Sequence, residues 1–173
     1  MNAGLLATIA GSIALLAGCF VASTWKLAEL HPNILHIQLT FSEDAFRTVL
    51  EAWGPEGVAR FRSHFVWDYG TLASYAVLGN AAGRWVVERV RATGLVAMLL
   101  PWLLAAAAIA DFAENLLHLR FIGAESGQLA PTLYALAGAC SSTKWTLLLG
   151  WPFLAAFLLL RPSHVALTRP TTR

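Results

Sequence analysis

Ionisable side chains occur inside long apolar stretches of this chain, where a charged group is energetically unfavourable unless it has a partner or a function. Four of them are candidate catalytic residues: Asp68, Asp111, Glu114 and Lys144. Carboxylates that share an apolar environment with a lysine can exchange protons at moderate pH. These residue types therefore predict acid–base chemistry on a lipid or isoprenoid-like substrate, or a proton relay for transport.

Four more hydrogen-bonding side chains are expected to join this group as ligand-binding or network residues: His64, Tyr75, Asn115 and His118. At 100° per residue, the polar residues of segment 111–118 share one face of a helix. His64 and Asp68 lie one helical turn apart on a second segment. The pattern predicts a polar cluster built from three helices, with Lys144 on the third.

A purely structural network is the simplest interpretation, with Lys144 neutralising one or two of the carboxylates. A metal site is a second interpretation, for which the candidate ligands are His64, Asp68, Glu114 and His118. It is not favoured, because carboxylate-bridged bundle sites use Glu-x-x-His spacing, whereas this chain has His-x-x-x-Asp and Glu-x-x-x-His. The sequence requires no cofactor, although a metal is possible.

The composition indicates which solvent surrounds these residues. The chain has 173 residues, of which 57% are hydrophobic and 13% are charged. A soluble domain carries about 25% charged residues, so the expected solvent is a lipid bilayer. The net charge of +2 and the lack of a basic stretch with interleaved aromatic residues argue against a nucleic-acid partner.

A helix needs about 20 apolar residues to cross the hydrocarbon of a bilayer. Four segments meet this requirement, at about 2–23, 65–87, 93–117 and 132–160. The expected fold is all-α, a polytopic membrane protein in which residues 1–173 form one integral domain with a four-helix transmembrane bundle. Pro101 and Pro152 lie inside the last two spans and are expected to bend them.

The placement of lysine and arginine predicts the orientation in a cell membrane, such as a bacterial inner membrane. The loop between the second and third spans contains Arg84, Arg89 and Arg91, and the C-terminal tail adds Arg161, Arg169 and Arg173. We therefore expect both termini to be cytoplasmic and segment 26–64 to form an outer loop. This orientation brings the polar cluster to the outer half of the bundle.

The outer loop is expected to have structure of its own. Its apolar residues alternate with polar ones over 35–41, which predicts an extended segment. Ser42 then caps a short helix whose apolar residues recur at helical spacing as far as Trp53. Gly54 ends this helix and Pro55 begins another, which continues into the second span. The short amphipathic helix is expected to cap the outer end of the bundle.

Small residues at helical spacing predict close packing between spans. The first span carries such a stripe: Ala3, Ala7, Gly11, Ala14 and Gly18. Gly79 and Gly83 form a GxxxG pair in the second span, and within one molecule these residues are expected to face neighbouring helices. An alternative for the first span is a lipoprotein signal that would be cleaved before Cys19, although the expected positive charge at its start is missing.

Two functions remain open. The first is a non-catalytic subunit or binding component, stabilised by the carboxylate–lysine–histidine network. The second is a small membrane enzyme or proton-coupled carrier that acts on a lipid or isoprenoid-like substrate through the same residues. The expected partners are the lipid bilayer, a lipid-like ligand and other membrane protein subunits.

Overall fold

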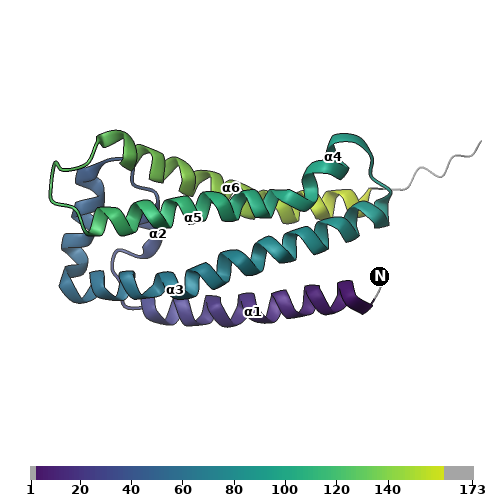
Figure 1. Ribbon diagram of the computed structural model, residues 1–173, viewed down its shortest axis with the longest axis horizontal. Helices are drawn as coiled ribbons and strands as arrows, with labels where there is room; N and C mark the ends of the chain where they lie inside the picture. The colour runs from purple at the N-terminus through teal and green to yellow at the C-terminus, as the bar shows by residue number, and fades with distance from the viewer. Residues whose placement is uncertain (1–2, 162–173) are drawn as a thin grey trace, which may run out of the picture.

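The computed structural model describes residues 3–161, and every regular element in this range is helical. The long helices run along one axis and lie side by side (Figure 1). In chain order the elements are α1 (Ala3–Leu27), α2 (Ile34–Gln38), α3 (Glu43–Val90), α4 (Gly94–Leu99), the 3₁₀ turn η1 (Leu100–Trp102), α5 (Leu103–Ile122) and α6 (Pro131–Leu160). The prediction of an all-α fold is confirmed.

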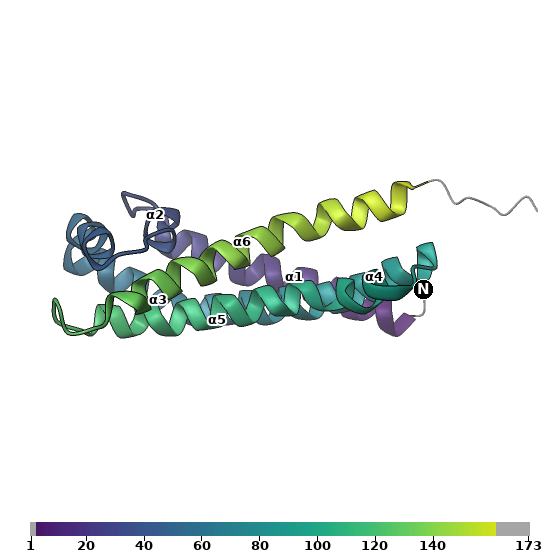
Figure 2. The ribbon, with the colours of Figure 1, turned by 90° about the horizontal axis from the view of Figure 1, so that it is seen from above.

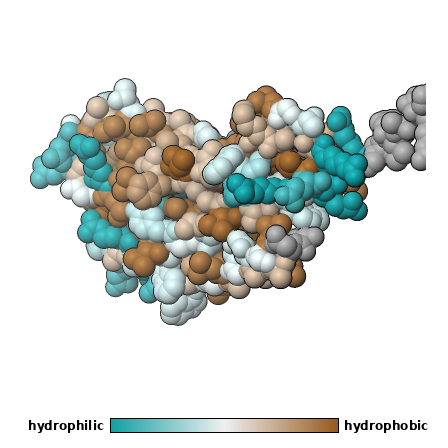
Figure 3. Space-filling view, turned by 45° about the vertical axis from the view of Figure 1, so that its right-hand side comes forward, coloured by the Kyte–Doolittle hydropathy of each residue, from teal (hydrophilic) through white to brown (hydrophobic). Residues whose placement is uncertain are grey.

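Three helical stretches within residues 3–161 are long and apolar enough to cross a membrane: Ala3–Leu27, Gly94–Ile122 and Pro131–Leu160. Their apolar side chains are largely on the surface, as Ile109 and Phe153 show with 72% and 76% exposure. Figure 3 shows hydrophobic residues across the middle of one face and hydrophilic ones toward its two ends. A surface of this kind suits lipid rather than water, so the chain is a plausible helical membrane protein.

α3 contains the predicted second span but is not among those three stretches. Its segment 65–87 includes Asp68 and Arg84 together with several glycines and other small or polar residues, which lower its mean hydropathy. α3 nevertheless packs against both α1 and α5. It forms the centre of the bundle, and Figure 2 shows from a second direction that α6 diverges from α5 toward the end where α1 begins.

The start of α3 forms the predicted cap. Ser42 accepts a hydrogen bond from the backbone N–H of Ala45, which begins the helix. At Gly54 the backbone has a φ of 63°, and the helix changes direction before Pro55. Glycine tolerates this left-handed region because it has no Cβ atom. The first part of α3 therefore lies across the end of the bundle, opposite the end where α1 begins and α6 finishes (Figure 1).

The prediction of an extended segment over 35–41 is wrong. This region contains the short helix α2, and the side chain of Asn33 caps it by accepting a hydrogen bond from the N–H of Leu35. Ile37 is fully buried, whereas Leu39 and Phe41 are each 50% exposed. The alternation in the sequence therefore reflects one buried side chain, Ile37, among exposed apolar ones. The capping hydrogen bond of Asn33 favours a helical backbone at this position.

Close packing between α3 and the apolar stretch Gly94–Ile122 is confirmed at the glycine pair Gly79 and Gly83. A Cβ atom on Gly83 would lie 2.7 Å from the Cα atom of Pro101, and Gly79 similarly faces Leu104. Pro101 interrupts the α-helix with the turn η1, as expected from its missing N–H group. Pro152 lies inside α6, which continues through it as one helix.

The small-residue stripe of α1 does not pack within the molecule, which corrects the expectation. A Cβ atom added to Gly11 or Gly18 would have no neighbouring heavy atom within 4 Å. α1 instead buries Ser12, Cys19 and Ser23, and Cys19 lies against Gly70 of α3. The face of α1 that contacts α3 therefore contains Ser12, Cys19 and Ser23. These side chains are small enough to pack beside small residues of α3 such as Gly70.

Candidate functional site

Lys144 lies at the centre of the candidate site, where α6 meets α5. Its Nζ atom lies 2.9 Å from Oδ1 of Asp111 and 2.7 Å from Oε2 of Glu114. All three side chains are almost inaccessible to solvent. A buried ammonium that contacts two carboxylates is stabilised by their charge, so this contact fixes α6 against α5.

α3 contributes Asp68 and Tyr75, which are hydrogen-bonded to residues of α5. The hydroxyl of Tyr75 donates a hydrogen bond to Oδ2 of Asp111 at 2.9 Å. The amide of Asn115 donates to Oδ2 of Asp68 at 2.5 Å. We call Asp68, Asp111, Glu114 and Lys144 the polar cluster, and α3, α5 and α6 each supply at least one of its members.

Glu114 is the most deeply buried member of the polar cluster, with no exposed surface. Its Oε1 atom has no hydrogen-bond partner among the described residues. Nδ1 of His118 lies 3.8 Å from this atom, which is beyond hydrogen-bond length. The hydroxyl of Ser141 on α6 also faces the carboxylate. Glu114 therefore depends on Lys144 for most of its stabilisation.

The two histidines lie toward the cap, in an aromatic layer. Nδ1 of His64 is hydrogen-bonded to the backbone carbonyl of Phe61, and the ring stacks on that of Phe61. The ring of His118 packs against Phe46 and Phe121. Within residues 3–161 no three histidine, cysteine, aspartate or glutamate side chains form a group that could hold a metal ion. The geometry gives the metal interpretation no support.

A cavity of about 580 Å³ lies beside the polar cluster, a volume in the usual range for small-molecule sites. Asp68, Tyr75, Asp111 and Lys144 form its polar end. Its apolar walls come from α1, α6 and the α1–α3 connection: Leu16, Phe20, Leu27, Leu30, Ile34 and Leu148. Glu114 does not line the cavity and lies behind Asp111 and Lys144.

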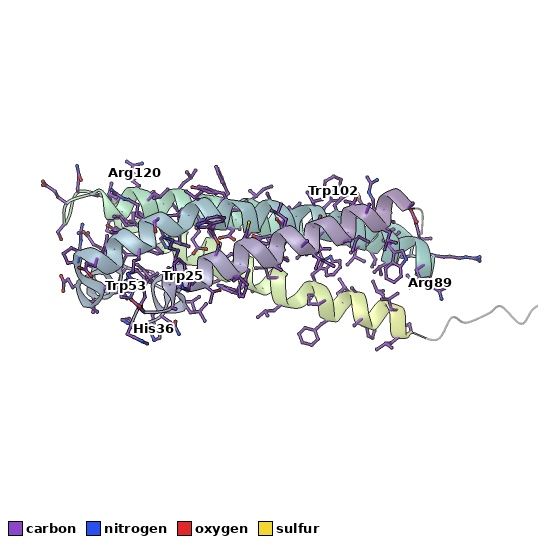
Figure 4. The ribbon with its side chains drawn as sticks, turned by 90° about the horizontal axis from the view of Figure 1, so that it is seen from below. Trp25, His36, Trp53, Arg89, Trp102 and Arg120 are labelled. Carbon is purple, nitrogen blue, oxygen red and sulfur yellow. The ribbon has the colours of Figure 1, made fainter. Side chains whose placement is uncertain are left out.

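The cavity lies between two helices that are not paired with each other. α1 packs on α3, and α6 packs on α5 and α3. Figure 4 shows α6 diverging from α1 toward the end of the bundle that carries Arg89, while Trp25, His36 and Trp53 lie at the capped end. Residues of both α1 and α6 line the cavity, together with residues of the α1–α3 connection.

Sequence reasoning missed two groups of residues at this site. Trp145 lines the cavity, and its indole N–H donates to Oε1 of Gln38, which connects α6 to α2. Its position next to Lys144 was the available signal. The walls from α1 had no signal, because Leu16 and Phe20 are indistinguishable in sequence from the lipid-facing leucines around them.

The site has the components of an amphiphile-binding pocket: a buried ionic end, an aromatic wall and an apolar remainder. It also places Asp68 and Asp111 where they contact whatever occupies the cavity, as acid–base chemistry would require. Comparisons with protein-family models, with curated proteins and with solved structures find no match to this chain.

Proposed function

We propose that this protein is a four-span membrane protein that binds a lipid-like molecule in the cavity between α1 and α6, as a non-catalytic binding component or subunit. The observation that carries the proposal is the cavity itself, which is apolar over most of its wall and ends at buried ionic groups. An amphiphile is divided in the same way, because its tail is apolar, like most of the cavity wall, and its head group is polar, like the ionic end. Two of the helices that line the cavity, α1 and α6, are apolar enough to cross a membrane, so such a molecule would reach the cavity from the bilayer.

The proposed fourth span is segment 65–87 of α3, which runs beside α1 and α5 along the bundle. With four spans, both ends of the described chain lie on one side of the membrane, and Arg84, Arg89 and Arg91 lie on that same side. The positive-inside rule then makes this side cytoplasmic. The cap and the polar cluster are placed toward the outer leaflet, in a cell membrane of the bacterial inner type.

Blocking the cavity tests the binding function. Leu16→Trp introduces a large ring into the cavity wall, whereas the matched variant Leu15→Trp adds the same ring to a side chain that is 56% exposed and does not line the cavity. Native mass spectrometry after extensive detergent washing measures the lipid that stays bound. We expect Leu16→Trp to lose the bound lipid and Leu15→Trp to keep it. Equal retention by both variants would exclude binding in this cavity.

The second candidate is an enzyme or a proton-coupled carrier that uses the same cluster. It is favoured by one observation, that Asp68 and Asp111 both line the cavity. Asp111→Asn separates the candidates, because Asp111 lines the cavity and this change removes its charge without changing the shape of the side chain. A structural network predicts a lower melting temperature for this variant. An active site predicts an unchanged or higher melting temperature together with loss of proton flux or lipid turnover in proteoliposomes.

A further inference from the structure

The polar cluster contains more acidic than basic side chains. It has three carboxylates and one ammonium, and the ammonium of Lys144 already contacts Asp111 and Glu114. Among the described residues no other lysine or arginine forms an ion pair with these carboxylates. The rings of His64 and His118 lie in the aromatic layer and do not line the cavity. The ionised cluster is therefore short of positive charge, which is unfavourable in an apolar medium.

Asp68 is the carboxylate that is available to a ligand. Its only hydrogen bond from a described residue comes from the neutral amide of Asn115. It is half-buried and lines the cavity. Asp111, by contrast, has one oxygen bound to Lys144 and the other to Tyr75. A cationic group in the cavity would thus meet Asp68 first.

We propose that the ligand in this cavity is an amphiphile with a positively charged amine head, held by Asp68 beside Asp111. The inference rests on the proposed function and specifies its ligand class. Charge complementarity supports it, because a monovalent ammonium reduces the excess negative charge of the cluster. Trp145 also lines the cavity, and the face of an indole ring attracts ammonium groups.

An anionic head fits this geometry less well. The nearest cation is Lys144, and its ammonium is shared between two carboxylates at 2.9 Å and 2.7 Å. A carboxylate or phosphate that approached Lys144 through the cavity would pass Asp68 and Asp111, both of which line it. An anionic head group close to these two carboxylates would be repelled strongly, because like charges interact strongly at low dielectric constant.

The test compares ligands that differ only in the head group. The full-length protein is purified in a neutral maltoside detergent and stripped of lipid. It is then titrated with saturated alkyl chains of one length that end in an amine, an alcohol or a carboxylate. Binding is measured by native mass spectrometry and by the change in tryptophan fluorescence. We expect the amine to bind about tenfold more tightly than the alcohol, equivalent to about 1.4 kcal/mol, and the carboxylate to bind most weakly.

Asp68→Asn is the matched variant, because it removes one charge and keeps the shape of the side chain. It is expected to remove most of the preference for the amine while leaving the affinity for the alcohol unchanged. The control Asp44→Asn removes the same charge from the exposed first turn of α3, at a residue that does not line the cavity. That control is expected to keep the preference. If Asp68→Asn does not fold, the ligand series on the unmodified protein still decides the question.

Two results would overturn the inference in distinguishable ways. If the alcohol or the carboxylate binds as tightly as the amine, and Leu16→Trp abolishes that binding, the cavity binds lipids without selecting a cation. The proposed function would then stand and the amine preference would be wrong. If no member of the series binds in a manner sensitive to Leu16→Trp, both proposals fail.

Discussion

The hydroxyl of Tyr75 donates a hydrogen bond to Oδ2 of Asp111 at 2.9 Å, and this bond joins α3 to α5. The other oxygen of Asp111 accepts from Lys144 on α6. A single carboxylate therefore connects three helices. Since hydrophobic burial does not hold helices together in lipid, polar contacts of this kind contribute to the specificity of packing.

Tyr75→Phe should weaken this connection while keeping the aromatic ring. A hydrogen bond to a charged group contributes about 1.5–3 kcal/mol, and we expect a loss of unfolding free energy in that range. Chemical denaturation in detergent micelles measures it. Tyr69→Phe is the control, because Tyr69 packs against Phe112 but donates no hydrogen bond to a described residue. An equal loss in both variants would show that the Asp111 contact contributes nothing specific.

Lys144→Met should destabilise the protein more strongly, since it leaves Asp111 and Glu114 buried without their cation. Breaking a buried ion pair from one side costs about 3–5 kcal/mol. The loss is measured as a lower melting temperature in detergent. Adding Glu114→Gln to Lys144→Met should restore part of the stability, because one uncompensated charge is then absent. Additive losses in the double variant would argue against direct coupling between the two side chains.

Gly83→Ala tests the close approach between α3 and η1. The added Cβ atom would lie 2.7 Å from the Cα atom of Pro101, and backbone atoms cannot move aside without shifting the helix. We expect a destabilisation of about 1–3 kcal/mol. Gly11→Ala is the matched control in α1, where the added atom has no neighbour within 4 Å. The control should be neutral or slightly stabilising, because alanine favours a helix over glycine.

Acid should loosen the contact between the cap and the α5–α6 loop. The backbone N–H of Gly127 and the side chain of Arg47 donate hydrogen bonds to Glu43, and together they lower the pKa of this carboxyl below 4.5. A lowered folded-state pKa means that the unfolded chain binds the proton more tightly. The stabilisation by Glu43 is therefore fully present above about pH 4.5 and is lost as the pH falls through the folded-state pKa.

Hydrogen exchange at the Gly127 amide is the direct measurement of this effect. Its protection should fall in acid for the unmodified protein and should be low at all pH values in Glu43→Gln. The control Glu56→Gln changes an exposed glutamate just after the break in α3 and should leave the pH profile unchanged. A Gly127 amide that stays protected in Glu43→Gln would contradict the assignment.

The sequence was sufficient to predict those helices for which the spacing of apolar residues and the positions of helix-breaking glycine and proline residues indicate the same boundaries. The apolar runs indicated the long helices, and Gly54 followed by Pro55 correctly predicted the break between the cap and the rest of α3. It was not sufficient where the same residues fit two periods. The alternation over 35–41 suited a strand, but the side-chain cap of Asn33 made the segment a helix. The α1 glycines suited a packing face, yet α3 meets α1 along Ser12, Cys19 and Ser23.

The convergence of Asp111, Glu114 and Lys144 followed from their types and depth, because charged groups in apolar helices need partners. The cavity beside them did not follow from the sequence. Its walls come from ordinary leucines and phenylalanines, and their inward direction depends on the rotation of α1 and on the position of α2. The role of Trp145 likewise depended on Gln38, which lies far away in sequence.

The lysine of the polar cluster comes from α6, the last helix within residues 3–161. While the ribosome is still translating α6, the earlier helices already carry acidic groups that have no counter-ion. The nascent chain must therefore hold these groups protonated or hydrated until Lys144 arrives. A chain that stopped before Lys144 would therefore contain Asp111 and Glu114 without the ammonium group that contacts both of them.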